Sequence, residues 1–273
     1  MTQLDIPALS KARLKLYVKL HQKKFRDSEG LFLAEGLRTV RELSENIPDE
    51  EMLVAILIRD GEPVGKQFFR THQGKVFSIN ERECSQLSGT STPQGIFGVF
   101  RQLSPAETLA AAGGGKMKKS FIVALDDVQD PGNVGTILRT AVWFGAEAMI
   151  CSSGSADRYN SKAVRSCAGS IYGIHHYGVE HLDLELLRLQ KLGYSIVSAS
   201  LDGKDFREFT SWPEKQVLVV GNEANGVSEP VKTLTDRLVR IPHSGSKPGV
   251  ESLNASVSAA ILMERMVLDH KAP

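Results

Sequence analysis

Short apolar runs alternate with amphipathic stretches along the whole chain of 273 residues. In the first hundred residues, apolar runs of strand length are separated by stretches of helical periodicity. We expect strands at 31–34, 52–58, 75–79 and 96–100, and helices at 35–46 and 81–87. This alternation predicts a small α/β domain in the N-terminal part of the chain.

A basic amphipathic stretch precedes these elements. Its apolar and aromatic residues recur at helical spacing, which predicts one helix over residues 8–26. These residues are Leu14, Tyr17, Val18, His21 and Phe25. Lys11, Lys15 and Lys19 form a stripe on another face, and no acidic residue occurs between Lys11 and Arg26. Two interpretations of this stripe stay open: a solvated lysine face, or a surface that contacts RNA phosphates.

The second half of the chain shows the same alternation. The expected strands are at 121–125, 148–151, 174–177, 194–199, 216–220 and 238–241. The expected helices are at 133–144, 161–167, 182–192, 229–235 and 253–270. Apolar, β-branched strands that alternate with helices predict a mostly parallel sheet with helices on both faces.

Residues 104–119 separate the two halves and combine an alanine run, Gly113–Gly115 and several lysines. The spacing of a phosphate-binding loop, G-x-x-x-x-G-K-[ST], is absent, and no strand precedes the glycines. This composition favours a flexible tether. We therefore divide the chain into a domain at 1–103, a linker at 104–119 and a second domain at 120–273.

The overall composition is typical of a soluble globular protein, with 41% hydrophobic and 24% charged residues. No apolar run reaches the ~18 residues of a transmembrane helix. The N-terminus lacks the basic and apolar regions of a signal peptide. A net charge of +1 argues against a protein that coats nucleic acid by bulk charge. We expect a cytoplasmic protein that does not act at a membrane.

The three cysteines, Cys84, Cys151 and Cys167, have no C-x-x-C spacing. We interpret them as free, buried thiols in a reducing compartment. His175 and His176 would point to opposite faces of a strand and cannot easily share a metal ion. We expect no metal site.

Polar segments follow three of the strands expected in the second half. They lie at 126–139, 221–226 and 241–256. The first places Arg139 two helical turns beyond Asn133, and we expect the two side chains to face the same way. Ligands of parallel sheets bind outside the carboxyl ends of the strands, so the three segments should gather at one site.

In order and spacing, these three segments resemble the motifs of the SpoU/TrmH superfamily of RNA ribose 2′-O-methyltransferases, which use S-adenosylmethionine. The resemblance, not the periodicity, implies a deep trefoil knot in the C-terminal α/β domain. Phe32–Gly36 and Thr92–Gly95 resemble the substrate-binding domain often fused to these enzymes, which is related to a ribosomal-protein RNA-binding fold. The expected fold is therefore a small α/β RNA-binding domain followed by a knotted methyltransferase domain.

The resemblance also implies roles for particular residues. The expected catalytic residues are Arg139, Asn133, Glu223, Ser252 and Asn254. Backbone groups around Gly221, Ile241 and Leu253, with Asn222, Gly226 and Pro242, are expected to hold the cofactor. The expected RNA contacts are Lys11, Arg13, Lys15, Lys19 and Arg38.

Simpler roles are possible for each candidate. Gly221–Gly226 could be a plain strand-to-helix turn, and Glu223 a solvated turn carboxylate. Asn133 could be an N-cap, and Ser252 or Asn254 could cap the last helix. Arg139 could pair with Asp126, Asp127 or Asp130. A literal base role for Arg139 conflicts with its chemistry, because a neutral guanidine is costly to form. We therefore expect Arg139 to orient the ribose phosphate and to stabilise a developing alkoxide.

The resemblance further implies RNA rather than DNA as the partner, with large-subunit rRNA expected because of the two-domain layout. The alternatives are a tRNA 2′-O-methyltransferase, an rRNA enzyme that confers antibiotic resistance, and a non-catalytic RNA-binding or ribosome-assembly protein. The stretch 243–249 is a few residues longer than in many members of the family, which leaves its cofactor contacts open.

A homodimer is also expected from the resemblance. The last helix has more apolar residues than a narrow core stripe needs: Val257, Ala260, Ile261, Met263, Met266 and Leu268. Part of that surface would meet a second subunit. Packing into the core of the same chain is the competing interpretation.

Overall fold

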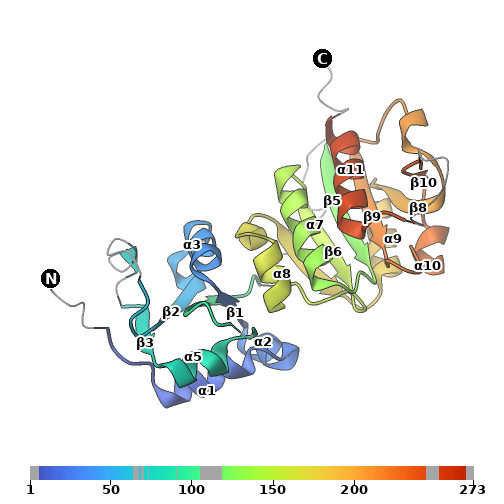
Figure 1. Cartoon of the computed structure of the whole chain (residues 1–273). Helices are drawn as coiled ribbons and strands as arrows, with labels where there is room; N and C mark the ends of the chain where they lie inside the picture. Colours follow the sequence, from blue (N-terminus) through green and yellow to red (C-terminus); the bar gives the residue numbers. More distant parts are fainter. Residues whose placement is uncertain are drawn as a thin grey trace. The chain divides into compact units, whose positions relative to one another are not determined.

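The structure is a computed structural model that describes residues 6–63, 68, 71–72, 74–90, 92–104, 119–243 and 252–268. The chain divides into two compact units (Figure 1). Unit 1 comprises Met1–Gln102 and Tyr159–Tyr172, and unit 2 comprises Leu103–Arg158 and Gly173–Pro273. Most of the expected linker (105–118), most of the long loop (244–250) and the last two residues of the expected C-terminal helix lie outside the described residues.

Unit 1 is built on a four-stranded sheet with the order β1-β4-β2-β3. Its strands are β1 (Leu31–Glu35), β2 (Leu53–Arg59), β3 (Val76–Ile79) and β4 (Ile96–Arg101). β4 is antiparallel to both β1 and β2, whereas β2 and β3 are parallel. All four strands lie within a few residues of the positions expected from the sequence.

Helices cover both faces of this sheet. Helices α1 (Lys11–Lys19) and α5 (Glu81–Leu87) bury Tyr17, Cys84 and Leu87 in one core cluster with strand residues. The other face packs against α3 (Leu37–Glu45) and the segment Tyr159–Tyr172. The short 3-10 helix η1 (Glu50–Met52) precedes β2.

The segment Tyr159–Tyr172 comes from the middle of the second half of the sequence, yet it belongs to unit 1. It carries α8 (Ser161–Ser166) and the 3-10 helix η2 (Ser170–Tyr172). The ring of Phe32 lies 4.9 Å from that of Tyr159 and 6.2 Å from that of Tyr172. The Tyr172 hydroxyl donates to the carbonyl of Arg101 at 2.6 Å. The helix itself was expected from the sequence, but its place in unit 1 was not.

The prediction of one helix over 8–26 is wrong, because the stretch forms α1 and a second helix, α2 (Lys23–Glu29). Gln22 between them is extended, with φ −97° and ψ 130°. Arg26 is buried and donates through Nη1 to the carbonyls of Leu20 at 2.7 Å and His21 at 2.9 Å. These carbonyls follow α1, so Arg26 stabilises the break and does not belong to the exposed basic surface.

Unit 2 contains a six-stranded sheet with the order β10-β8-β9-β5-β6-β7. Its strands are β5 (Ser120–Asp126), β6 (Ala148–Ser152), β7 (His175–Val179), β8 (Ser195–Asp205), β9 (Lys215–Gly221) and β10 (Arg237–Arg240). Every neighbouring pair is parallel, which confirms the predicted parallel sheet. β8 extends well beyond the expected end at Ala199.

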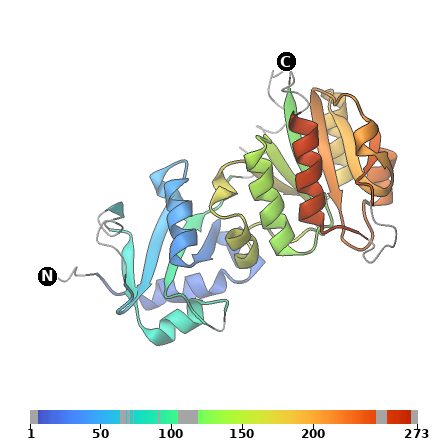
Figure 2. The same ribbon diagram turned by 45° about the horizontal axis from the view of Figure 1, so that its top comes forward.

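The faces of this sheet are covered by different pairs of helices (Figure 2). Helices α7 (Pro131–Trp143) and α11 (Ala255–Leu268) lie side by side on one face. Helices α9 (Leu182–Lys191) and α10 (Glu229–Thr233) cover the other, where they share a core cluster with alternate strand residues. The 3-10 helix η3 (Phe206–Glu208) follows β8. Burial on both faces explains the continuous apolar runs of these strands.

Within the described residues, no helix is long and apolar enough to cross a membrane. His175 is exposed and His176 is buried, as alternation along β7 predicts. Cys84, Cys151 and Cys167 are free and buried.

Candidate functional site

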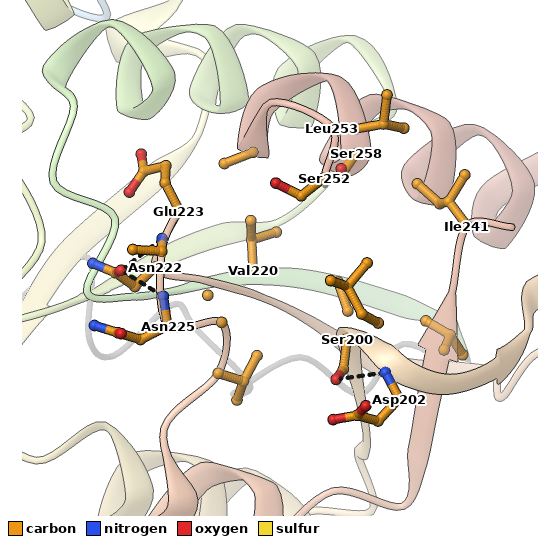
Figure 3. Close-up of a pocket in the computed structure, with 18 of the residues that line it drawn as sticks. Ser200, Asp202, Val220, Asn222, Glu223, Asn225, Ile241, Ser252, Leu253 and Ser258 are labelled. Carbon is orange, nitrogen blue, oxygen red and sulfur yellow. Dashed lines mark hydrogen bonds between the residues drawn. The ribbon is translucent and has the colours of Figure 1, made fainter. Parts of the chain in front are cut away.

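A cavity of about 440 Å³ opens at the carboxyl ends of β8, β9 and β10 in unit 2 (Figure 3). The second and third motif segments both line it, and so does the tail of β8. Of the expected cofactor residues, Gly221, Asn222, Gly226, Ile241 and Leu253 line the cavity. Pro242 is not among the lining residues. The carboxyl ends of parallel strands thus bring together residues that are far apart in sequence.

The loop after β9 closes tightly on itself. Asn222 and Gly226 exchange two backbone hydrogen bonds of 2.9 Å each. The Asn222 side-chain oxygen accepts from the amides of Ala224 at 2.9 Å and Asn225 at 3.0 Å. A Cβ atom on Gly221 would overlap the backbone of Gly226 and Val227. Only glycine therefore allows the strand to run straight into this loop.

A directional chain of hydrogen bonds joins the three motif segments beside the cavity. Asn254 caps α11, since its Oδ1 accepts from the amide of Ser256 at 2.9 Å. Its Nδ2 donates to Asn133 Oδ1 at 3.0 Å, and Asn133 Nδ2 donates to Glu223 Oε1 at 2.8 Å. The second carboxylate oxygen, Oε2, accepts from the amide of Gln129 at 3.4 Å. The side-chain oxygens of Asn254 and Asn133 both accept hydrogen bonds already. The side-chain NH2 group of Asn133 therefore needs another acceptor, which Glu223 supplies.

This geometry decides between several alternatives. Asn133 is not the N-cap of α7, because the side chain of Asp130 accepts from the amide of Gly132 and the helix begins at Pro131. Asn254 does cap its helix, and it also bonds Asn133. Glu223 is bonded on both oxygens rather than only solvated. Ser252 lines the cavity, and no described residue bonds its exposed hydroxyl.

The aspartates of the first motif hold loops in place. Asp126 is buried, and its carboxylate accepts from the amide of Ser228 at 2.7 Å. Asp127 has a left-handed backbone with φ 61°. The side-chain amide of Asn222 donates to the carbonyl of Asp127 at 2.9 Å and to its carboxylate at 3.3 Å. The turn after β5 is thereby fixed to the loop after β9.

Arg139 lies apart from this network. It is exposed, whereas Asn133 is buried, so the prediction that they face the same way is wrong. Six residues along an α-helix correspond to a rotation of roughly 240°. No described residue forms a hydrogen bond or an ion pair with Arg139, so the alternative of an ion pair with the aspartates is also wrong. Arg139 instead shares the exposed face of α7 with Trp143, which is 83% exposed.

The expected RNA-contacting residues lie in unit 1. On α1, Lys11 and Lys15 are exposed, Arg13 lies 5.0 Å from the ring centre of Phe77, and Lys19 lies 4.9 Å from that of Phe25.

Arg38 lies on α3, which covers the opposite face of the sheet from α1, so the structure does not bring it into the α1 surface. Its Nε donates to Glu42 at 2.8 Å, and this bond raises the pKa of Arg38.

The segment Ala199–Asp202 also lines the cavity, although no site role was predicted for it from the sequence. The predicted strand ended at Ala199, so the polar residues that follow it were assigned no role. Ser200 and Asp202 directly follow an apolar strand of a parallel sheet, and that position was the available signal.

Residues 120–264 match the SpoU rRNA Methylase family, and residues 11–98 match the MRM3-like substrate binding domain. The chain is 32% identical to a 23S rRNA guanosine 2′-O-methyltransferase of Bacillus subtilis over 262 residues, which cover 95% of this chain and 97% of that protein. It is 30% identical to a 23S rRNA guanosine 2′-O-methyltransferase of Nitrosomonas europaea over 190 residues, covering 70% and 72% of the two chains. A solved structure of an AdoMet-bound rRNA methyltransferase from Sinorhizobium meliloti aligns with a TM-score of 0.78 and 27% identity, over 98% of each chain.

Proposed function

The chain belongs to the SpoU rRNA methylase family, and from that premise we propose that it methylates a ribose 2′-hydroxyl of large-subunit (23S) ribosomal RNA with S-adenosylmethionine. One observation carries the proposal: the hydrogen-bonded chain from Asn254 through Asn133 to Glu223 lies beside a cavity lined by two of the motif segments. The relatives named as 23S rRNA 2′-O-methyltransferases support rRNA as the substrate class.

The cavity suits the proposed cofactor. Its volume of about 440 Å³ lies in the range of small-molecule sites. Apolar side chains, including Ile241 and Leu253, alternate with backbone and small polar groups. Its walls include one basic side chain, Lys232, which is paired with Glu229 at 2.8 Å. That lining favours a ligand with an uncharged flat ring over a polyphosphate.

When bound, S-adenosylmethionine supplies an electrophilic methyl group. The chain itself has to hold the ribose in line and stabilise the charge that develops on its 2′-oxygen. We assign Glu223, Asn133 and Asn254 to holding the loop after β9, α7 and α11 in fixed relation. Ser252 places a hydroxyl without a described partner in the cavity wall.

We assign the electrostatic role to Arg139. A guanidinium that no described residue pairs can bind a phosphate oxygen and stabilise a developing alkoxide. It does not act as the base, because a neutral guanidine is costly to form. The proton then leaves to a phosphate oxygen or to water.

We further propose a homodimer formed through the exposed faces of α7 and α11. Trp143 on α7 is 83% exposed, and Val257 and Leu268 on α11 are 47% and 42% exposed. Exposed aromatic and aliphatic residues on two neighbouring helices are typical of a protein interface. Sedimentation of wild type and of Trp143→Asp tests this, and we expect the variant to shift toward monomer. Equal sedimentation of the two proteins would contradict the proposed interface.

Family membership also suggests the deep trefoil knot and residence in the cytoplasm. A crystal structure traced continuously into α11 would test the knot. Three buried free thiols support a reducing compartment. Burial raises the pKa of each thiol, that of Cys167 to about 11, so all three stay protonated near neutral pH. Cell fractionation tests the compartment.

The test of the main proposal is transfer of labelled methyl groups to separated large rRNA, small rRNA and tRNA that lack native modifications. We expect label on large rRNA and one new linkage that resists alkaline cleavage, as ribose 2′-O-methylation requires. Label on tRNA alone would support the tRNA enzyme instead. No label in any fraction or in pre-ribosomal particles, with cofactor binding intact, would support a non-catalytic RNA-binding protein.

A further inference from the structure

The tail of β8 leaves its ladder with β10 and forms one wall of the cavity. Leu238 of β10 lies opposite Ser198, but the next residue, Val239, lies opposite Lys204. Residues 199–203 therefore bulge out between two paired stretches. Four of these five residues, 199–202, line the cavity. The excursion thus positions part of the site rather than extending the sheet.

Gly203 makes this excursion possible. A Cβ atom at Gly203 would lie 2.6 Å from the backbone N and C atoms of Val239. Backbone atoms of a paired strand cannot move aside as a flexible side chain can. Any larger residue at this position must shift the returning chain, and with it the cavity wall.

The carboxylate of Asp202 has unused capacity to accept hydrogen bonds. The backbone amide of Asp202 donates to Ser200 Oγ at 3.3 Å, which places the two side chains together on one wall (Figure 3). No described residue donates to the Asp202 carboxylate. Lys232, the basic residue of the lining, is already bonded to Glu229 at 2.8 Å. Glu223, by contrast, accepts on both oxygens.

Asp202 and Glu223 lie on different sides of the cavity (Figure 3). The side of Glu223 carries the hydrogen-bonded chain to Asn133 and Asn254, where the reacting groups have to meet. The adenosine part of a cofactor must then occupy the remaining space. That space is bordered by apolar residues, including Leu201 at 61% and Leu253 at 49% exposure, which suit the faces of a purine ring. The ribose joins the purine directly, so its hydroxyls would reach the neighbouring wall.

We propose that Asp202 accepts hydrogen bonds from the ribose hydroxyls of the cofactor, with Gly203 as the positioning residue. Ser200 lies beside it as a second polar group on the same wall. A carboxylate is the acceptor that suits such a diol, because its bonds are charge-assisted and it has no donor of its own. This inference rests on the proposed use of S-adenosylmethionine.

Calorimetric binding of S-adenosylhomocysteine, the demethylated cofactor, tests the proposal without catalysis. We expect Asp202→Ala to raise Kd about 10- to 100-fold, as loss of a hydrogen bond to a charged group does. Asp202→Asn, which keeps one acceptor oxygen, should raise Kd less. Glu208→Gln, at an exposed carboxylate of η3 that is not among the lining residues, is the matched control and should leave Kd unchanged.

Analogues of the ligand identify the group that Asp202 contacts. The 2′-deoxy and 3′-deoxy analogues should bind wild type more weakly than S-adenosylhomocysteine does. In Asp202→Ala, the difference in affinity between S-adenosylhomocysteine and these analogues should largely vanish. If instead the affinity lost by removing the amino group of the ligand disappeared in Asp202→Ala, Asp202 would contact the methionine end, and the ribose assignment would be overturned. Equal Kd values for wild type and Asp202→Ala would also overturn it. Failure of wild type to bind would instead contradict the proposed function.

Gly203→Ala tests the positioning role. We expect a raised Kd and a raised KM for the cofactor, with kcat at saturating cofactor close to that of wild type, because the catalytic groups lie on other elements. Gly89→Ala is the control, since a Cβ there meets neighbours only at 3.6 Å or more. A folded Gly203→Ala protein with unchanged Kd would show that the excursion does not shape the ribose site.

Discussion

The two units present their polar groups in opposite ways. In unit 2, side chains beside the cavity form a hydrogen-bonded network: Asn133 at its centre is buried, Glu223 and Asn254 at its ends are exposed, and every link has a defined donor and acceptor. In unit 1, the basic side chains of α1 project into solvent or lie over the rings of Phe77 and Phe25. One region is organised by directional bonds and the other by exposed charge.

This difference has consequences for how each unit responds to substitution. A hydrogen-bonded network with a buried centre loses stability when one member changes, because the buried side chain is left without a partner. Exposed charges act through a screened field, so each contributes little and depends on salt. We therefore expect unit 2 to control the rate of reaction and unit 1 to control RNA affinity.

Arg139 is the exception, since it is an exposed cation in unit 2, and its removal should have the largest effect. We expect Arg139→Ala to lower kcat about 10²- to 10³-fold, the usual cost of one donor to a developing oxyanion. Binding of S-adenosylhomocysteine should stay near that of wild type, because Arg139 does not line the cavity. The measurement is single-turnover methyl transfer with calorimetry alongside.

Arg207→Ala is the control for loss of an exposed arginine, since Arg207 of η3 pairs locally with Asp205. Equal losses of binding and rate in Arg139→Ala would remove the catalytic role and make Arg139 a structural residue.

Changing Glu223, the exposed acceptor at the end of the hydrogen-bonded network, should have the next largest effect. In Glu223→Gln, one of the two bonded groups, the Asn133 amide or the Gln129 backbone N–H, must face another donor. We expect kcat to fall about 10- to 100-fold and the free energy of unfolding to fall by about 0.5–1.5 kcal/mol. Methyl-transfer assays stopped at fixed times measure kcat, and thermal unfolding measures the free energy of unfolding. Glu208→Gln, at an exposed carboxylate of η3 that is not among the lining residues, should change neither.

Charge reversal on α1 should change affinity without changing the rate. We expect Lys11→Glu with Lys15→Glu to weaken RNA binding and to reduce the slope of log K against log salt by about 0.7 to 0.9 for each phosphate that the variant no longer neutralises. Filter binding at several salt concentrations measures this, and kcat at saturating RNA should be retained. The matched control reverses the charges of Lys191 and Lys204, two exposed lysines of unit 2, by substituting glutamate for each. If the α1 variant bound RNA as tightly as wild type, the lysines of α1 would form only a solvated face.

The smallest effect should come from Arg38, which already has a partner in Glu42. We expect Arg38→Ala to weaken RNA binding only slightly, because an exposed pair competes with phosphate and contributes little by itself. Glu42→Gln should release Arg38 and strengthen binding slightly at low salt. If Arg38→Ala weakened RNA binding as much as the α1 variant, the pair with Glu42 would not limit Arg38, and α3 would contribute to RNA binding as α1 does.

The sequence determined the order and type of nearly all elements and the family, since period and turn chemistry are local properties. It placed the unit 2 strands to within a few residues, except for the tail of β8, and identified Gly221 and Leu253 as cavity residues. It could not determine the break between α1 and α2, because the buried Arg26 that stabilises it acts through a contact between turns.

Only the tertiary structure decided which side chains meet. Asn133, Glu223 and Asn254 are remote in sequence, and their bonds exist because the parallel strands end at one edge of the sheet. The same applies to Asp202, whose place in the cavity wall follows from the register shift between β8 and β10. The packing of Tyr159–Tyr172 in unit 1 likewise has no local signal. Local patterns fix the elements, whereas pairing and close approach between distant segments fix the site.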